Sequence, residues 1–273
     1  MKTILAATDF SDVADNAVDY ASAFAVFAKA RLILFNGYAI PVPVSSDVPI
    51  VTIPFDELEA ESMKQLKALE KKLTNKHPGL EIELVSRAGF VADEILKVQE
   101  EKKTWLTVMG ITGAGRAAAL FGSNATTLQK LSESPIIIVP KNAKFSIPGK
   151  IALAADFRSI IPDKVVDKFK EMVRLFKCKI AVFDVLRTTE LVSYTKAAAE
   201  VNLENSLGDL KHSFFFPSGD DPVAETNDFI DRNNIDMLVM IPHNYSFITK
   251  LFHRSVTKKM ALHTHIPLLS IHE

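Results

Sequence analysis

The sequence predicts an α/β protein made of two tandem domains, each with a parallel sheet covered by helices on both faces. Short apolar runs alternate along the chain with longer helical patterns, which is typical of right-handed βαβ crossovers. The order of these segments is also repeated, and the opening run ILAATDF at 4–10 returns as IALAADF at 151–157. For a chain of 273 residues, this repeat favours a division into domains 1–145 and 146–273.

The first half is predicted to contain five strands and four helices. Ser11 is the expected N-cap of the first helix, and Asp12 lies in the first turn, where a negative charge favours the helix dipole. A long proline-bearing loop is expected between the second strand and the charged second helix. The expected strands are 4–7, 32–35, 82–85, 106–109 and 136–139, and the later helices are 56–72, 92–100 and 124–131.

The second half repeats this order over fewer residues. Asp9 aligns with Asp156 and Met109 with Met240, so about sixteen residues are missing between these points, most simply from the loop after the second strand. The expected strands start at Ile151, Ile180, Ser213, Met237 and Leu268, and the expected helices are 165–176, 191–207, 223–232 and 256–262.

Composition excludes several classes of protein. Lys and Arg total 32 and Asp and Glu total 33, so the balance does not favour a nucleic-acid backbone or an anionic membrane as a partner. No apolar stretch is long enough to span a membrane, and Cys178 is the only cysteine, so an intrachain disulfide is excluded. Because the chain runs from Met1 straight into a strand without a signal-peptide pattern, we expect a cytoplasmic protein.

Glycines follow the fourth strand of the first half, at the edge where open parallel sheets bind ligands. Gly110 and Gly113 allow the backbone to approach a ligand and to adopt positive φ. Gly122 and Ser123 lie at the expected start of the next helix, where free N–H groups and the helix dipole favour an anion. This pattern predicts a polyphosphate site, with ordinary turn glycines and a serine cap as the alternative. Asp9 is expected at the same edge if the first and fourth strands are neighbours.

The second half has lost these glycines. Ile241, Asn244 and Arg254 occupy the three aligned positions, so we expect no triphosphate there. Two further motifs are weak. Gly113-x-Gly115-x-x-Ala118 follows the wrong strand for a dinucleotide fingerprint. His263 and His265 lack a cysteine or an acidic partner, so no metal site is predicted.

The chain resembles the universal stress protein family, as two tandem copies. Gly110-x2-Gly113-x8-Gly122-Ser123-Asn124 is similar to the family's Gly-x2-Gly-x9-Gly-Ser/Thr motif, although its second spacer is one residue shorter. The opening Ala7-Thr8-Asp9-Phe10-Ser11 and the segment Gly89 to Ile95 also match. The resemblance implies an adenine-nucleotide α-hydrolase-like, Rossmann-like fold in each half, with a five-stranded parallel sheet.

The resemblance also implies a binding site for ATP or another adenine nucleotide in the first domain, and a degenerate second domain. Mg²⁺ would be bound through the phosphates. No catalytic residue and no protein metal ligand are identified, so slow ATP hydrolysis is the most that we expect. By analogy, Ala7 and Asp9 would lie near adenine, Gly37 would offer its backbone to the base, Gly110 and Gly113 would flank ribose and phosphates, and Gly122, Ser123 and Asn124 would contact the phosphates.

Two alternatives to nucleotide binding remain open. A stress-response scaffold that acts through protein–protein contacts is favoured by the short spacer and the lost glycines, whereas a hydrolase lacks a nucleophile–base pair. Family members pair their fifth strands across a two-fold axis, which implies an intramolecular pseudo-dimer here, with a homodimer as the intermolecular alternative. Prolines at Ile137 and Leu269 are expected to remove hydrogen-bond donors from that contact.

Overall fold

The computed structural model describes residues 1–38, 54–110, 127–129, 131–155, 157, 161–186, 194–241 and 265–272. In the first half, every predicted strand is present, and α1 begins directly after its predicted N-cap, Ser11. The predicted fourth helix lies largely outside the described residues, although 127–129 and 131 are helical. The elements are β1 (Thr3–Ala7), α1 (Asp12–Ala28), β2 (Arg31–Tyr38), α2 (Phe55–Lys76), β3 (Ile82–Ala88), α3 (Val91–Lys102), β4 (Leu106–Gly110) and β5 (Ile136–Val139).

The second half has the same order of elements, and its predicted last helix, 256–262, lies outside the described residues. The missing residues fall between the second and third strands, as predicted, and the loop after β7 lies largely outside the described residues. The elements are β6 (Lys150–Ala154), α5 (Asp163–Phe176), β7 (Lys179–Phe183), α6 (Tyr194–Leu207), β8 (His212–Phe215), α7 (Pro222–Asn233), β9 (Met237–Met240) and β10 (Leu268–Ser270).

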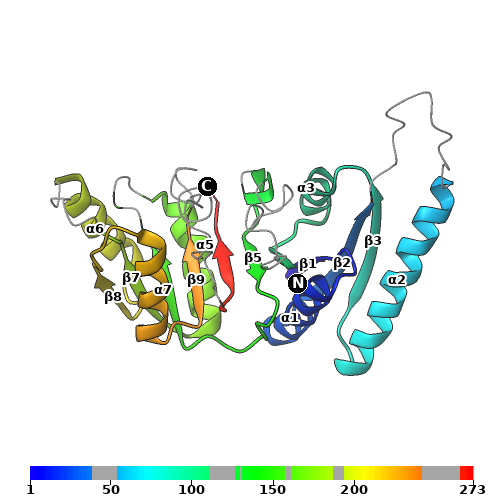
Figure 1. Cartoon of the computed structure of the whole chain (residues 1–273), viewed down its shortest axis with the longest axis horizontal. Helices are drawn as coiled ribbons and strands as arrows, with labels where there is room; N and C mark the ends of the chain where they lie inside the picture. The colour runs from blue at the N-terminus through cyan, green and yellow to red at the C-terminus, as the bar shows by residue number, and fades with distance from the viewer. Residues whose placement is uncertain are drawn as a thin grey trace.

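The ten strands among the described residues form one sheet, in the order β3-β2-β1-β4-β5-β10-β9-β6-β7-β8 (Figure 1). The pairs within each half are parallel, and the two halves join through the antiparallel pair β5–β10 at the middle of the sheet. In each half the chain order reverses beside the first strand, which is flanked by β2 and β4 in one half and by β7 and β9 in the other. Ligand sites are favoured beyond the carboxyl ends of the strands at such a reversal.

The hydrogen bonds of the β5–β10 junction come from alternate residues. The Thr107 N–H donates to the Pro135 carbonyl, so Pro135 and Ile137 direct their backbone groups toward β4. The Ile271 N–H donates to Met240, so Leu269, two residues earlier, faces β9. Prolines at Ile137 and Leu269 would therefore remove N–H groups that face β4 and β9, and not those of the β5–β10 junction. The expectation that these prolines remove donors from the junction is wrong. The junction is bonded through the opposed pairs Ile138–Leu268 and Ile136–Ser270.

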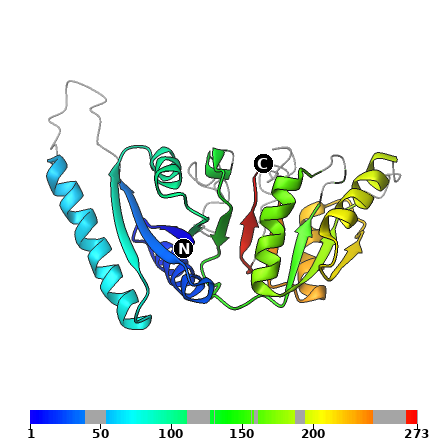
Figure 2. The ribbon, with the colours of Figure 1, turned by 180° about the vertical axis from the view of Figure 1, so that it is seen from behind.

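Side chains from both halves also pack together on one face of the sheet. Phe24 of α1 lies 5.2 Å from Phe145 and 5.5 Å from Phe176 of α5, measured between ring centroids. The Asn16 amide fixes the segment between the halves by donating to the carbonyls of Pro140 and Ala143. This face of the core extends across α1, α2, α5 and α6, whereas α3 and α7 cover the opposite face (Figure 2). None of the helices described has the length and apolarity needed to cross a membrane.

Candidate functional site

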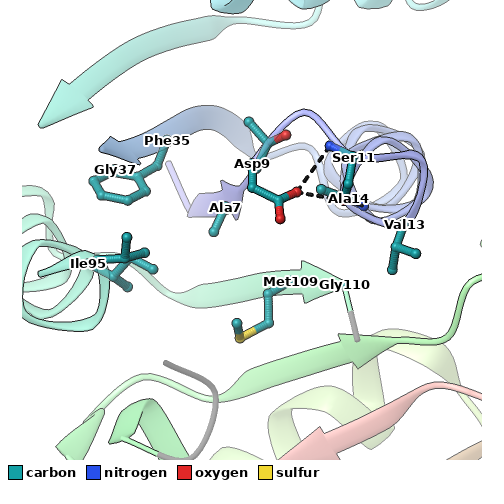
Figure 3. A pocket seen from close by; sticks show the side chains of 12 residues that line it. Ala7, Asp9, Ser11, Val13, Ala14, Phe35, Gly37, Ile95, Met109 and Gly110 are labelled. Atoms are coloured by element: carbon teal, nitrogen blue, oxygen red, sulfur yellow. Dashed lines mark hydrogen bonds between the residues drawn. The ribbon is translucent and has the colours of Figure 1, made fainter. Parts of the chain in front are cut away.

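A pocket of about 130 Å³ lies at the carboxyl ends of β1, β2 and β4 (Figure 3). Its walls come from the ends of these strands, the β1–α1 turn, the first turn of α1 and the start of α3. Apolar side chains form most of the surface, and Asp9 is its only acidic residue among those described. The pocket is lined by Ala7, Thr8, Asp9, Ser11, Val13, Ala14, Phe35, Gly37, Val91, Ile95, Met109 and Gly110.

The β1–α1 turn is held in shape by its own side chains. The Phe10 N–H donates to Thr8 Oγ1 at 2.9 Å, and Phe10 has a φ of 61°, which an L residue rarely adopts. Asp9 Oδ1 accepts hydrogen bonds from the Ser11 N–H at 3.1 Å and from Ser11 Oγ at 2.6 Å. Ser11 Oγ in turn accepts from the Ala14 N–H and so caps α1. The turn needs only four residues, which brings the first turn of α1 to the pocket.

Gly37 leaves an edge of backbone facing the pocket. The Thr8 N–H donates to the Phe35 carbonyl, whereas the Tyr38 carbonyl accepts from Gly89 on the β3 side. Because successive residues of a strand direct their backbone groups to opposite sides, the N–H and C=O of Gly37 face the β1 side. β1 has already ended there, and no described residue forms a hydrogen bond with Gly37 on that side. A Cβ at this position would lie 3.1 Å from Val91 Cγ2 and would narrow the pocket.

Gly110 has a packing reason to be glycine. A Cβ at this position would lie 2.8 Å from the Val13 carbonyl oxygen of α1 and 3.0 Å from Val13 Cγ1. Its φ is not positive, so the left-handed freedom considered from the sequence is not used here. The close approach of β4 to α1 therefore requires this glycine whether or not a ligand is bound.

A buried chain of polar side chains lies behind the pocket and was missed by the sequence analysis. The Asn36 amide of β2 donates to the Thr8 carbonyl at 2.8 Å. Ser62 of α2 donates to Asn36 Oδ1 at 2.7 Å and lies 2.6 Å from Ser86 Oγ of β3. Two sequence signals could have revealed it. Asn36 interrupts an apolar strand, and Ser62 continues the buried stripe of α2 that includes Leu66 and Leu73.

Of the eight predicted site residues, the structure brings four together. Ala7, Asp9, Gly37 and Gly110 all line the pocket. Gly113, Gly122, Ser123 and Asn124 lie outside the described residues, so their place relative to the pocket stays a prediction. Asp9 is exposed at the edge of the pocket, beside the N-terminus of α1 (Figure 3).

At the strand end that corresponds to Gly37, the second half carries a buried side chain. The pairs Ala7–Phe35 and Ala154–Phe183 are equivalent in register, so Val185 occupies the position of Gly37. Val185 is buried with Phe183 on the same face of the sheet. In the same way, Ile241 occupies the position of Gly110.

The connection before the first helix differs as well. In the second half it spans residues 155–162, twice the length of the turn between β1 and α1. Phe157, in this connection, is buried, and its ring lies 6.1 Å from the rings of Phe214 and Phe216. Phe157 corresponds to Phe10 and packs on the α5 face of the sheet, so among the described residues Val185 is the one that occupies the region equivalent to the pocket.

Comparison with known proteins finds universal stress proteins among the relatives of the chain. The model of the universal stress protein family matches residues 1–140. Universal stress protein MJ0531 of Methanocaldococcus jannaschii is 28% identical over 148 residues, which cover 52% of this chain and 84% of that protein. The crystal structure of a universal stress protein from Archaeoglobus fulgidus covers 99% of this chain and 96% of its own, with 17% identity and a TM-score of 0.72. A universal stress protein in complex with cAMP covers 50% of this chain and 96% of its own, at 28% identity and a TM-score of 0.39.

Proposed function

Because the chain belongs to the universal stress protein family, we propose that it is a stress-response regulatory protein that binds an adenine nucleotide in its first domain. The nucleotide-binding domain is residues 1–145, and residues 146–273 form a degenerate second domain. The base binds in the pocket at the ends of β1, β2 and β4. The two domains act as an intramolecular pseudo-dimer through the β5–β10 pair.

The observation that carries this proposal is the free edge of β2 at Gly37. Its N–H and C=O face the same side, toward the space that β1 leaves. Adenine presents an acceptor ring nitrogen next to a donor amino group, so one N–H and one C=O are complementary to it. Guanine presents a ring N–H next to a carbonyl oxygen and would set donor against donor and acceptor against acceptor. An unpaired polar group of this kind costs about 1 to 3 kcal/mol, which favours adenine.

The remaining described groups fit the flat base and the ribose. Ala7, Phe35, Ile95 and Met109 give an apolar lining for the ring faces. Asp9 keeps one carboxylate oxygen, Oδ2, without a hydrogen bond to the described residues, and it would accept one from a ribose hydroxyl.

The phosphates are assigned to Gly110, Gly113, Gly122, Ser123 and Asn124 by their sequence motif. The described residues hold no cluster of three metal-ligating side chains, and Asp9 Oδ1 is already engaged with Ser11. Mg²⁺ would therefore be bound chiefly by the phosphates of ATP. ATP is the nucleotide that we propose.

One observation favours the alternative of a scaffold that binds no nucleotide. The close contact of Gly110 with Val13 explains this glycine by packing alone. On that alternative, the pocket would be a by-product of the short β1–α1 turn, and the protein would act through contacts with a protein partner. The two functions differ in one expectation. Filling the pocket would weaken ATP binding if the protein binds a nucleotide, and would have no ATP binding to weaken if it is a scaffold.

Calorimetric titration of the whole chain with Mg²⁺-ATP tests the proposal. Gly37→Val, which copies Val185, should lower the affinity for ATP by about tenfold or more, since the new side chain enters the pocket and each factor of ten needs only about 1.4 kcal/mol. Valine suits a strand, so the variant should stay folded. Gly149→Ala is the matched control, because its Cβ meets only Asp236 Oδ2, at 3.6 Å, far from the pocket.

Competition with GTP, adenosine and cAMP then defines the ligand. GTP should compete poorly, and adenosine should compete through the base and ribose alone. ATP binding to a folded Gly37→Val chain with unchanged affinity would contradict the proposal. Absence of ATP binding by the unmodified chain would favour the scaffold.

A further inference from the structure

The buried chain of side chains behind the pocket has a role beyond packing. Asn36, Ser62 and Ser86 lie on β2, α2 and β3, and Asn36 and Ser62 are 6% and 5% exposed. All three avoid the cost of a buried unpaired polar group by bonding to one another and to Thr8. Apolar residues could fill the same volume without hydrogen bonds. The chain is therefore a specific link between α2 and the β1–α1 turn.

The direction of the hydrogen bonds is fixed at each step. Ser62 uses its one hydroxyl proton on Asn36 Oδ1, so Ser86 must donate to Ser62. With its oxygen occupied in this way, Asn36 presents its amide group to the Thr8 carbonyl. An asparagine flipped by 180° would place its oxygen against the Thr8 carbonyl and its amide against the Ser62 proton.

The bond from Asn36 fixes one peptide plane of the β1–α1 turn. Because a peptide unit is planar and trans, the Asp9 N–H points opposite to the Thr8 carbonyl. The side chain of Asn36 lies on the α2 face of the sheet, whereas Phe35 and Gly37 line the pocket. The Asp9 N–H is therefore directed away from α2, toward the pocket side, and no described residue accepts a hydrogen bond from it.

We propose that Asn36, supported by Ser62 and Ser86, is a positioning residue that orients the Thr8–Asp9 peptide so that the Asp9 N–H can bind the nucleotide. This inference rests on the proposed function for its ligand, but not for its geometry. It makes α2 part of the binding machinery, although α2 contributes no residue to the lining of the pocket. The second half has Asp184 at the position of Asn36, so it lacks the amide donor.

Asn36→Asp is the decisive variant, because it keeps the shape and exchanges the amide for a carboxyl group. As a carboxylate it would face the Thr8 carbonyl without a proton, whereas as a neutral acid it could donate as the amide does. Burial raises the pKa of a carboxyl group, so the acid form is accessible under mild conditions.

The groups that form hydrogen bonds with Asn36 carry no charge. Its hydrogen-bond partners, the Thr8 carbonyl, Ser62 and Ser86, are neutral. Tyr38 shares this face of β2, and burial, with Glu59 and Asp56 of α2, raises the pKa of its phenol. The ionisable residues nearest in the chain are Asp9 and Arg87, which follow Thr8 and Ser86.

The experiment follows two signals in the whole chain, at about pH 7.5 and about pH 5. The first is hydrogen exchange of the Phe10 and Ser11 amides without ligand, and the second is the dissociation constant for Mg²⁺-ATP and for adenosine. At the higher pH, Asn36→Asp should speed exchange at both amides and weaken binding by about tenfold. At the lower pH, both signals should return toward those of the unmodified chain measured under the same conditions.

Asn233→Asp is the matched control, since the Asn233 amide donates to the Phe229 carbonyl in the second half at 2.9 Å. It should change neither signal. Exchange at Phe10 and Ser11 that is unaltered by Asn36→Asp would overturn the proposed orientation, even if no nucleotide bound. Loss of binding that does not recover at the lower pH would show a general structural effect and would also overturn it. Failure of the unmodified chain to bind ATP would contradict the proposed function alone.

Discussion

The two halves of the chain share one topology, yet among the described residues the first half has a pocket where its strand order reverses and the second has a buried valine at the equivalent strand end. The difference comes from a few positions. Gly37 and Gly110 in the first half correspond to Val185 and Ile241 in the second. The connection to the first helix is also twice as long in the second half, and Phe157 in it is buried. A βαβ frame thus tolerates either a pocket or a buried side chain beside its switch point, according to the residue at the strand end.

The largest expected effect comes from breaking the β5–β10 junction, which joins the two halves of the chain. Ser270→Pro removes the N–H that bonds Ile136 across β5–β10 and should lower the free energy of unfolding by about 3 kcal/mol or more. Urea denaturation of the whole chain measures the change. Ser270→Ala keeps the N–H and serves as the control. Equal stability of the two variants would show that this ladder does not hold the halves together.

Exchanging the residue at the end of β4 should have the next largest effect. Gly110→Ile copies Ile241, but its Cβ would lie 2.8 Å from the Val13 carbonyl oxygen. Overpacking of this kind costs about 1 to 3 kcal/mol, and a clash with backbone belongs at the upper end. Thermal unfolding should show a drop of several degrees. A variant as stable as the unmodified chain would mean that α1 can move away from β4. The short β1–α1 turn would then not require glycine at position 110.

The reciprocal exchange on the second strand should cost somewhat less. Val185→Gly removes a buried side chain and adds backbone freedom, so it should lower the free energy of unfolding by about 2 kcal/mol. It should not create ATP binding, because the second half also has Ile241, Asn244 and Arg254 at the positions of the motif glycines. Denaturation and calorimetric titration of the same variant check both statements. Measurable ATP binding by this variant in the second half would show that the Val185 side chain alone prevents nucleotide binding there.

The smallest expected effect lies at the outer edge of the second half, where His212 occupies the position of Ile82. Burial lowers the pKa of His212, but hydrogen bonds with the Glu204 carboxylate and the Leu210 carbonyl outweigh it, so the pKa is raised. The resulting stability is present at low pH and is lost as the pH rises through the raised pKa.

Glu204→Gln should remove this pH-dependent part. Because Glu204 is 56% exposed, the loss should be below about 0.5 kcal/mol at about pH 5.5 and close to zero at about pH 8.5. Urea denaturation at the two pH values measures it. A larger loss at the higher pH would reverse the sign and contradict the assignment.

The sequence predicted the order of the elements well, because strand and helix periods are local properties. The alignment of ILAATDF with IALAADF, the Ser11 cap and the apolar runs each depend on neighbouring residues alone. The placement of Asp9 and Gly110 at one edge also followed from a general rule for parallel sheets, whereas Ala7 and Gly37 were predicted from the family resemblance.

Features that depend on contacts distant in the sequence were not predicted. The reason for glycine at position 110 lies in Val13, and the partner of Asn36 is the carbonyl of Thr8. The direction in which each N–H of β5 and β10 points depends on which neighbour each residue bonds, so the choice of proline positions from sequence was wrong.

The most direct test of the difference between the halves is hydrogen–deuterium exchange of the whole chain with and without Mg²⁺-ATP, read by mass spectrometry. We predict slower exchange in peptides that contain the β1–α1 turn and the end of β2, at 5–15 and 33–38. We predict no change in the equivalent peptides of the second half, at 152–166 and 181–186. Protection confined to the second half, or equal protection in both halves, would contradict a nucleotide site in the first half alone.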